Sequence, residues 1–367
     1  MSIVNDLIHA LDRQYSLSRA ESWDRVGLQI GDANAPVNSV LVAHEVTDAV
    51  LNEAAAFDAL VVYHPLIFRP LENLDYKNHT ARLAGQCLAH GLHLIAVHTA
   101  LDNAPLPYAL GDKLAESLGL REVAVLSAAG RESLFKIVVF TPLEALEAVS
   151  TAMWEAGAGQ IGNYDRASFR ARGIGTFRPL PGADPYSGKV GEMEEADEWR
   201  LEVLVPAAQR EAVVRALIQA HPYEEVAYDV HSLHNTINPY GSARMGVLPA
   251  ELSLDEWAQQ VQEKLRAPNV RVVQGGKAVL KVACAPGSGA SVIGAAVRAG
   301  CDCLVTGDIK HHDALKAQAL GLSLIDATHT ATERAAVGLI ADALQTVPDL
   351  KIARCAIDTN PFRAVAI

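Results

Sequence analysis

The chain has 367 residues, of which 50% are hydrophobic, and a formal net charge of −12 at pH 7. At about 100–200 residues per domain, this length predicts two or three domains. No apolar run approaches the roughly 18 residues that a membrane span needs, and the acidic balance argues against a nucleic-acid partner. The five cysteines are scattered and lack C-x-x-C pairs, which favours free thiols in a reducing cytoplasm over disulfides or a cysteine-based metal site.

Strands and helices alternate over the first part of the chain. Residues 3–11 have apolar side chains at helical spacing, and Asp6 and His9 interrupt any signal-peptide core there. Further on, the pattern predicts strands at 38–46, 58–64 and 92–98 and helices at 48–57 and 79–91. This alternation is typical of βαβ units and predicts a largely parallel sheet.

The pattern changes after residue 131. It predicts, in order, a strand at 134–142, a helix at 143–157, a Gly-rich hairpin with a long loop, a strand at 199–206, a helix at 208–221 and a strand at 226–233. The order β-α-β-β-α-β is that of a ferredoxin-like α+β sandwich. Residues 235–246 (NTINPYGSARMG) have Asn, Pro, Gly and Ser but little apolar periodicity, which predicts a linker.

The βα alternation resumes after this segment. Ser253 and Glu256 form the sequence pattern of a capping box at the start of a helix. Strands are predicted at 278–289, 301–308 and 322–329, and helices at 290–300, 312–321 and 330–344. The Gly-rich stretch APGSG (285–289) lacks the Lys of a P-loop, so we interpret it as a tight turn without a ligand.

Two similar five-residue motifs indicate an internal repeat. HTALD (98–102) and HTATE (329–333) both read His-Thr-Ala-x-acid, and each follows a predicted strand. The segments before them also align, 58–65 with 302–309 and 86–102 with 316–333, with one gap. The sequence therefore predicts two related βα halves, 1–131 and 247–367, that form one domain interrupted by the insert 132–234 and the linker 235–246.

The repeat brings imidazoles and carboxylates to strand ends. Ligands bind at the carboxyl ends of parallel strands, where His64, His98, Asp308 and His329 are predicted to lie. Asp102 and Glu333 come four residues after a histidine and would share a helix face with it. Imidazole and carboxylate together suit divalent Zn, Fe, Mn or Co, and two such ions can act jointly in hydrolysis. This α/β domain is therefore predicted to bind metal.

The other histidines carry weaker signals. His311 and His312 follow Asp308 and could line the same crevice, although exposure at a helix start is an equal alternative. Four further histidines have no comparable setting, and we interpret them as structural or solvent-exposed; they are His44, His79, His90 and His93.

With these motifs, the chain resembles the Nif-three-like dinuclear metal-centre family, whose members often carry the label GTP cyclohydrolase 1 type 2. The resemblance covers nearly the whole length and rests on SWDRVGLQIGD (22–32), HPLIF (64–68), HTALDNAP (98–105), GSG (287–289), VTGDIKHH (305–312) and LIDATHTATE (324–333). In the insert, GAGQIGNYDRASF, GTFRPLPGADP and HPYEEVAYDV resemble the PII/CutA-like module of longer bacterial members.

The resemblance implies a toroidal homohexamer with two divalent ions per chain. It implies His64, Asp102, His329 and Glu333 as ligands, with Glu333 bridging the ions. The chain departs from the family at Tyr63, where members have a histidine before the one at 64, so Tyr63 and His98 are less certain members of the ligand set. A phenol of pKa about 10 must lose its proton to bind metal well.

Two further departures concern backbone and charge. Thr328 stands where members carry Gly before the metal-binding histidine, and His44-Glu45 stands where they more often show Asp. The function implied is a metal-dependent hydrolase of the cyclohydrolase or phosphoesterase type, located in the cytoplasm, with His98, His311 and His312 as candidate proton carriers. The alternative is a non-catalytic metal-handling or regulatory protein, because PII-like and CutA-like modules are sensors rather than catalysts. The sequence does not identify the small-molecule substrate or effector.

Overall fold

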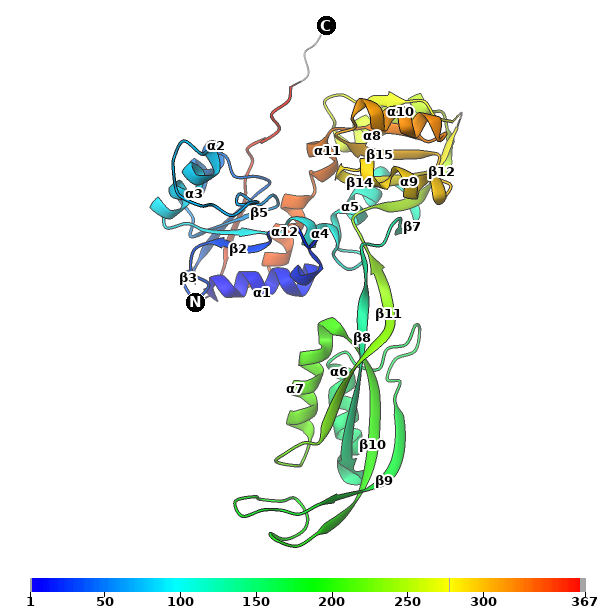
Figure 1. The fold of residues 1–367 in the computed structure, drawn as a ribbon. Coiled ribbons are helices and arrows are strands. Elements are labelled where there is room, and N and C mark those ends of the chain that lie inside the picture. The colour runs from blue at the N-terminus through cyan, green and yellow to red at the C-terminus, as the bar shows by residue number, and fades with distance from the viewer. Residues whose placement is uncertain (1, 277, 364–367) are drawn as a thin grey trace. The chain divides into compact units, whose positions relative to one another are not determined.

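The computed structural model describes residues 2–276 and 278–363, and its contacts divide the chain into two units. Unit 1 combines Met1–Gly130 with Pro239–Ile367, and unit 2 is Arg131–Asn238 (Figure 1).

The first half of unit 1 is built on a five-stranded sheet in the order β17-β4-β5-β6-β2. Strands β4, β5, β6 and β17 are parallel, and β2 is antiparallel to β6. Along the strands of this sheet, buried side chains point alternately into two cores. Helices α1 and α12 cover one face of the sheet, and α2 and α3 cover the other. The bounds are β2 Gly27–Ile30, β4 Ser39–Ala43, β5 Ala59–Val62, β6 His93–Ala96, β17 Lys351–Arg354, α1 Val4–Tyr15, α2 Asp48–Ala54, α3 His79–Ala89 and α12 Ala336–Leu344.

The second half of unit 1 has a six-stranded sheet in the order β13-β16-β15-β14-β12-β7. Here β14, β15 and β16 are parallel, and the other pairings are antiparallel. Helices α5 and α8 pack on one face, and α9 and α10 pack on the other. The bounds are β7 Arg121–Val125, β12 Arg244–Leu252, β13 Arg271–Val273, β14 Val279–Ser288, β15 Cys303–Gly307, β16 Ser323–Asp326, α5 Leu110–Leu118, α8 Leu254–Leu265, α9 Ile293–Arg298 and α10 His311–Ala319.

The topology of unit 1 repeats in its two halves. Each half has three parallel strands in spatial order, β4-β5-β6 and β14-β15-β16, with an antiparallel strand beside the third. A five-residue helix follows the third strand each time: α4 (His98–Asp102) is HTALD, and α11 (His329–Glu333) is HTATE. The two related α/β halves predicted from the sequence are therefore present.

Each half also receives elements from the other end of the chain. Strand β7 and helix α5, which precede the insert, belong to the second sheet and its core. Strand β17 and helix α12, near the C-terminus, complete the first sheet and its core. The small ribbon of β1 (Ser2–Ile3) and β3 (Pro36–Val37) lies beside α1.

Unit 2 has the β-α-β-β-α-β order predicted for the insert. Its four strands lie in the order β11-β8-β10-β9, which is the ferredoxin-like arrangement, and α6 and α7 pack together on one face (Figure 1). The bounds are β8 Gly130–Pro142, α6 Leu146–Glu155, β9 Phe169–Phe177, β10 Glu194–Pro206, α7 Arg210–Ala220 and β11 Tyr228–Tyr240. Short 3-10 turns occur at η1 Leu17–Arg19, η2 Leu143–Ala145, η3 Ala207–Gln209 and η4 Ala290–Val292.

The boundary between the two units falls inside the predicted linker 235–246, but most of this segment is strand rather than loop. Strand β11 continues through Tyr240 and β12 begins at Arg244, so only residues 241–243 lie between them. Asn, Pro and Gly suggested a loop because they have low strand propensity, but backbone pairing with neighbouring strands overrides it here. Over the described residues, 2–276 and 278–363, no helix is both long and apolar enough to cross a membrane.

Candidate metal centre

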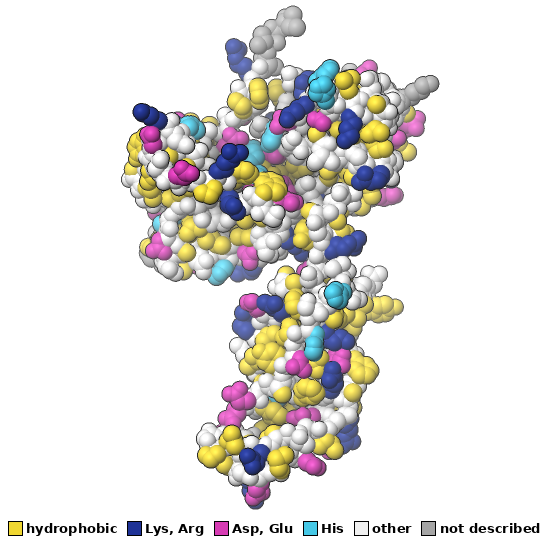
Figure 2. Space-filling view, viewed as in Figure 1, with side chains coloured by type: hydrophobic (Ala, Val, Ile, Leu, Met, Phe, Trp, Pro, Cys, Tyr) yellow, Lys and Arg dark blue, Asp and Glu magenta, His cyan; other side chains and the backbone are white. Residues whose placement is uncertain are grey.

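The candidate site lies in unit 1, where the carboxyl ends of its strands meet. His44 directly follows β4, His64 comes two residues after β5, and α4 follows β6. From the second half, α11 follows β16 and lies between the two sheets (Figure 1). In the space-filling view, histidine and acidic side chains are visible in the hollow between these parts of unit 1 (Figure 2).

A single carboxylate oxygen forms the centre of the site. Glu333 is 4% exposed, and its Oε2 lies 3.2 Å from Nε2 of His44, 3.5 Å from Nε2 of His64 and 3.1 Å from Nε2 of His329. His329 and Glu333 are four residues apart on α11, so one helical turn holds both side chains on one face. Two residues from each half therefore converge on one point.

Three histidines near this point have a carboxylate at the opposite ring nitrogen. Nδ1 of His329 lies 2.7 Å from Asp308, Nδ1 of His64 lies 3.2 Å from Glu45, and Nδ1 of His98 lies 2.8 Å from Asp24. A carboxylate in this position fixes the ring orientation and leaves Nε2 for another partner. This pairing is typical of histidines that bind metal through Nε2.

The electrostatics match a cage that attracts positive charge. Burial raises the pKa of Glu333, but the close contacts with the His329 and His44 rings outweigh it and lower the pKa to about 2. The close contact with Glu333 raises the pKa of His329 to about 9. Burial lowers the pKa of His44, yet the nearby carboxylates of Glu333 and Glu45 raise it to about 9. Without an ion, protons therefore occupy nitrogens that a cation would otherwise hold.

The residues present fit a divalent ion. Both ring nitrogens of His44 and Oε2 of Glu333 are buried and make no geometrically satisfactory hydrogen bond. The ligand atoms of His44, His64 and Glu333 all lie within 4.8 Å of one another. A Cβ added at Gly287, whose φ is +61°, would collide with Oε1 of Glu333, so a glycine keeps this space open. Imidazole nitrogens with a carboxylate suit Zn, Fe, Mn or Co.

Asp102 lies beside this group and has a different partner. Its Oδ1 accepts a hydrogen bond of 2.8 Å from the hydroxyl of Tyr63. Burial, together with the nearby charge of Glu333, raises the pKa of Asp102 to about 7. Burial also raises the pKa of Tyr63 well above its usual value, so this phenol keeps its proton and donates a hydrogen bond to Asp102.

The structure brings most of the sequence-predicted residues together, but not all. His64, His329 and Glu333 meet directly, and the His98 ring lies 5.3 Å from the His64 ring. His311 and His312 lie at the exposed start of α10, and no contact of either with Glu333 is recorded in the described part of the chain. Sequence reasoning placed His44 outside the site, although its position at the end of a buried strand is the same signal that identified His64.

Backbone strain is concentrated around the site. His98, Asp308 and Thr328 have φ values of +36°, +53° and +71°, in the left-handed region that favours glycine. Such residues occur where the surrounding structure holds the chain in a functional conformation. At Thr328 a glycine would adopt the same backbone conformation without strain.

We expect Thr328→Gly to stabilise the protein by about 1 kcal/mol, because relief of strain exceeds the added entropy of the unfolded chain. For a chain of this size the melting temperature should rise by about 2 °C, as calorimetry would measure. Thr328→Ala keeps the Cβ and is the control for loss of the buried hydroxyl. Its melting temperature should rise less than that of Thr328→Gly. An equal gain in the two variants would contradict a backbone origin.

The fold and the site define a two-lobed α/β protein with a histidine–carboxylate cage of the kind that holds divalent ions. Residues 2–361 match the DUF34/NIF3 (NGG1p interacting factor 3) family, and the chain belongs to this family. A Bacillus subtilis protein named "GTP cyclohydrolase 1 type 2 homolog" is 40% identical over 350 residues, which cover 94% of this chain and 93% of that protein.

Solved structures agree with this assignment. A Bacillus cereus protein related to NIF3 is 35% identical, has a TM-score of 0.87, and the match covers 99% of each chain. A Staphylococcus aureus protein is 29% identical with a TM-score of 0.73, again over 99% of each chain. The insert lies inside these matched lengths, so both units are part of the shared architecture.

Proposed function

We propose that this protein binds one divalent metal ion tightly through His44, His64, His329 and Glu333. The observation that carries this proposal is the convergence of three Nε2 atoms on one buried carboxylate oxygen, within 3.5 Å. His44 then supplies the imidazole that Tyr63 does not. A second ion, beside Asp102, binds weakly because Tyr63 occupies Asp102 with a hydrogen bond. The total of two ions per chain, one tight and one weak, stays a prediction.

We further propose that the bound metal serves hydrolysis. The name GTP cyclohydrolase given to relatives and the solvent access of the cage support this proposal, since the side chains of His64 and His329 are 22% and 34% exposed. A divalent ion supplies Lewis acidity, which lowers the cost of charge that develops on the group under attack. The bond broken would be a phosphoester or a ring C–N bond.

His98 is suited to carry a proton in such a reaction. Asp24 holds its Nδ1 at 2.8 Å and also accepts a bond from the backbone N–H of Thr99. This arrangement fixes the ring and leaves Nε2 to exchange a proton with a substrate. His311 and His312 are less suited, because they are exposed on α10.

Exposed aromatic rings beside His98 favour a substrate with a flat ring. Trp23 is 52% exposed and Phe68 is 44% exposed, with centroids 5.7 Å apart. The Trp23 ring lies 6.0 Å from that of His98. Such rings bind planar groups by stacking, as a purine substrate would require.

We expect His98→Asn to abolish turnover while metal content stays at the native level. The test uses full-length protein reconstituted in turn with Zn, Fe, Mn and Co. Opening of the GTP ring is measured as the release of formate. Phosphoester cleavage is measured with bis-p-nitrophenyl phosphate as the substrate. A general acid–base group typically contributes about 10²–10⁴-fold to the rate.

His311→Asn is the matched control and should keep native turnover. Full metal content without product from either substrate, in any metal form, would contradict hydrolysis of these bonds and favour a metal-handling role. The toroidal hexamer is part of the same proposal, and the native mass in solution tests it separately.

A further inference from the structure

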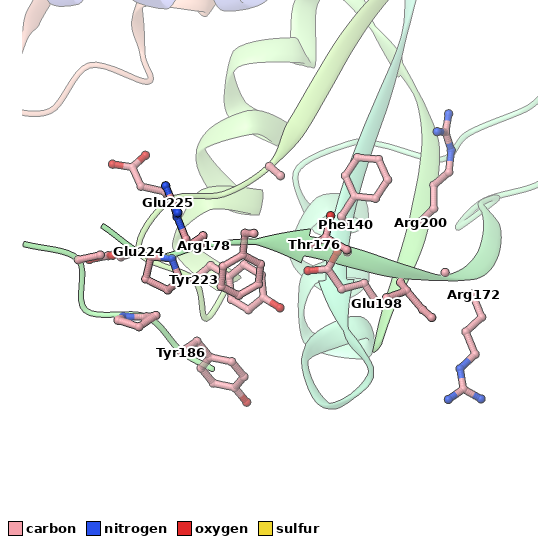
Figure 3. Close-up of a pocket in the computed structure, with 18 of the residues that line it drawn as sticks. Phe140, Arg172, Thr176, Arg178, Tyr186, Glu198, Arg200, Tyr223, Glu224 and Glu225 are labelled. Carbon is pink, nitrogen blue, oxygen red and sulfur yellow. The ribbon is translucent and has the colours of Figure 1, made fainter. Parts of the chain in front are cut away.

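Unit 2 contains a cavity of about 710 Å³ that is separate from the candidate metal centre. Its walls come from β9, β10, the loop that joins them, and the segment after α7 (Figure 3). Cavities of roughly 300–1,000 Å³ are the size of small-molecule sites.

A buried carboxylate lines this cavity. Glu198 is 8% exposed, and the hydroxyl of Tyr223, a neutral group, bonds to it. Within residues 2–276 and 278–363, no ion pair between Glu198 and a basic side chain is recorded. A carboxylate buried without a counter-charge is costly, so a cation that enters the cavity would be bound favourably.

The nearby histidine does not supply that charge. Nε2 of His221 lies 3.0 Å from the carbonyl oxygen of Phe140, and its Nδ1 accepts a hydrogen bond of 3.1 Å from the backbone N–H of Tyr223. An imidazole that donates at one nitrogen and accepts at the other is neutral. Burial also lowers the pKa of His221. Its role is to hold the Tyr223 segment in place.

Aromatic rings surround the space beside the carboxylate. The Tyr223 ring lies 6.4 Å from Phe177 and 5.6 Å from Tyr186, and Phe140 also lines the cavity. Figure 3 shows Tyr223, Tyr186 and Phe140 around the same space as Glu198. Rings with a nearby carboxylate attract flat organic cations through their π faces.

Glycine keeps the carboxylate accessible. Gly173 is the direct ladder partner of Glu198, and a Cβ added at Gly175 would collide with the Glu198 carboxylate. The absence of side chains at both positions of β9 leaves room for the carboxylate and for a ligand beside it.

Charged side chains of both signs lie at the rim. Arg172, Arg178 and Arg200 line the cavity and are exposed, and so are Glu224 and Glu225. The outer end of a ligand can therefore meet a charge of either sign.

We propose that this cavity is a binding site for a small organic molecule with a planar amidinium or guanidinium head, which pairs with Glu198 among the aromatic rings. This proposal does not depend on the metal centre or on catalysis.

Benzamidine is the probe, because it combines a flat ring with an amidinium group. Calorimetric titration of the full-length native protein should give one site per chain. Benzamide, which is neutral, and benzoate, which is anionic, should bind at least about tenfold more weakly. Glu198→Gln keeps the shape of the side chain but removes its charge, and it should weaken benzamidine binding by at least about tenfold.

Glu195→Gln is the matched control, since Glu195 lies on the same strand but does not line the cavity. It should bind benzamidine like the native protein. Gly175→Ala tests independently whether the space beside the Glu198 carboxylate is needed, and it should also weaken benzamidine binding. No binding of benzamidine to the native protein, equal binding to Glu198→Gln, or a preference for benzoate would each overturn the proposal. Unchanged metal content in all variants would show that unit 1 is intact.

Discussion

Replacement of Glu333 by Gln is expected to weaken divalent-metal binding by at least about hundredfold. Loss of a residue that only orients a ligand typically costs about 10–100-fold, and Glu333 is itself the oxygen on which three imidazoles converge. The amide keeps the size of the side chain but not its charge, so His44 and His329 lose the group that raises their pKa. Metal per chain after dialysis, measured by elemental analysis, gives the result.

Two companion variants make this prediction sharper. Asp308→Asn removes only the bond that orients His329, so it should cost about tenfold. Glu195→Gln, far along the sequence in unit 2, should cost nothing. Metal retention in Glu333→Gln at the native level would refute the proposed centre. Mass in solution should be measured alongside, because a fall in mass together with metal would indicate a structural ion.

Replacement of Tyr63 by His is expected to raise tightly bound metal from one to two ions per chain. The change removes the phenol that donates to Asp102 and adds an imidazole at the same point. Asp102 is half-buried and has a pKa of about 7, so a cation beside it would favour its charged form. Elemental analysis of both proteins, purified in the same buffer, measures the difference.

Tyr63→Phe separates the two effects of that change. It frees Asp102 but offers no ligand, so we expect it to keep one ion. Two ions in the native protein would mean that Tyr63 does not restrict the second position. One ion in Tyr63→His would mean that Asp102 is not a ligand in this chain.

Local sequence patterns predicted much of unit 1 because strands, helices and their order leave periodic signals. The capping box at Ser253 is present, with the Ser253 side chain accepting from the backbone N–H of Glu256. The pairing of β7 and β17 with sheets of the opposite half left no such signal, since it depends on contacts between distant segments. Composition misled at 235–246, where backbone pairing decides the structure.

The site was predictable where the repeat pointed to it. His64, His329 and Glu333 follow strands whose counterparts could be aligned. His44 was missed because the strand before it lies outside the aligned segments of the repeat. His311 and His312 were included because they follow Asp308, but a helix that starts at His311 turns them towards solvent. Closeness in sequence is therefore a weaker guide than position at a strand end.

The division of the ligands between the two halves has a consequence for how the protein is made. During synthesis, His44 and His64 leave the ribosome long before His329 and Glu333, which lie in the second half of unit 1. Strand β17, which borders β4, emerges later still. An incomplete chain thus presents only two imidazoles of the cage and an unfinished sheet edge beside them. In the proposed centre, a chain therefore needs the folded second half before it can offer all four ligands to an ion.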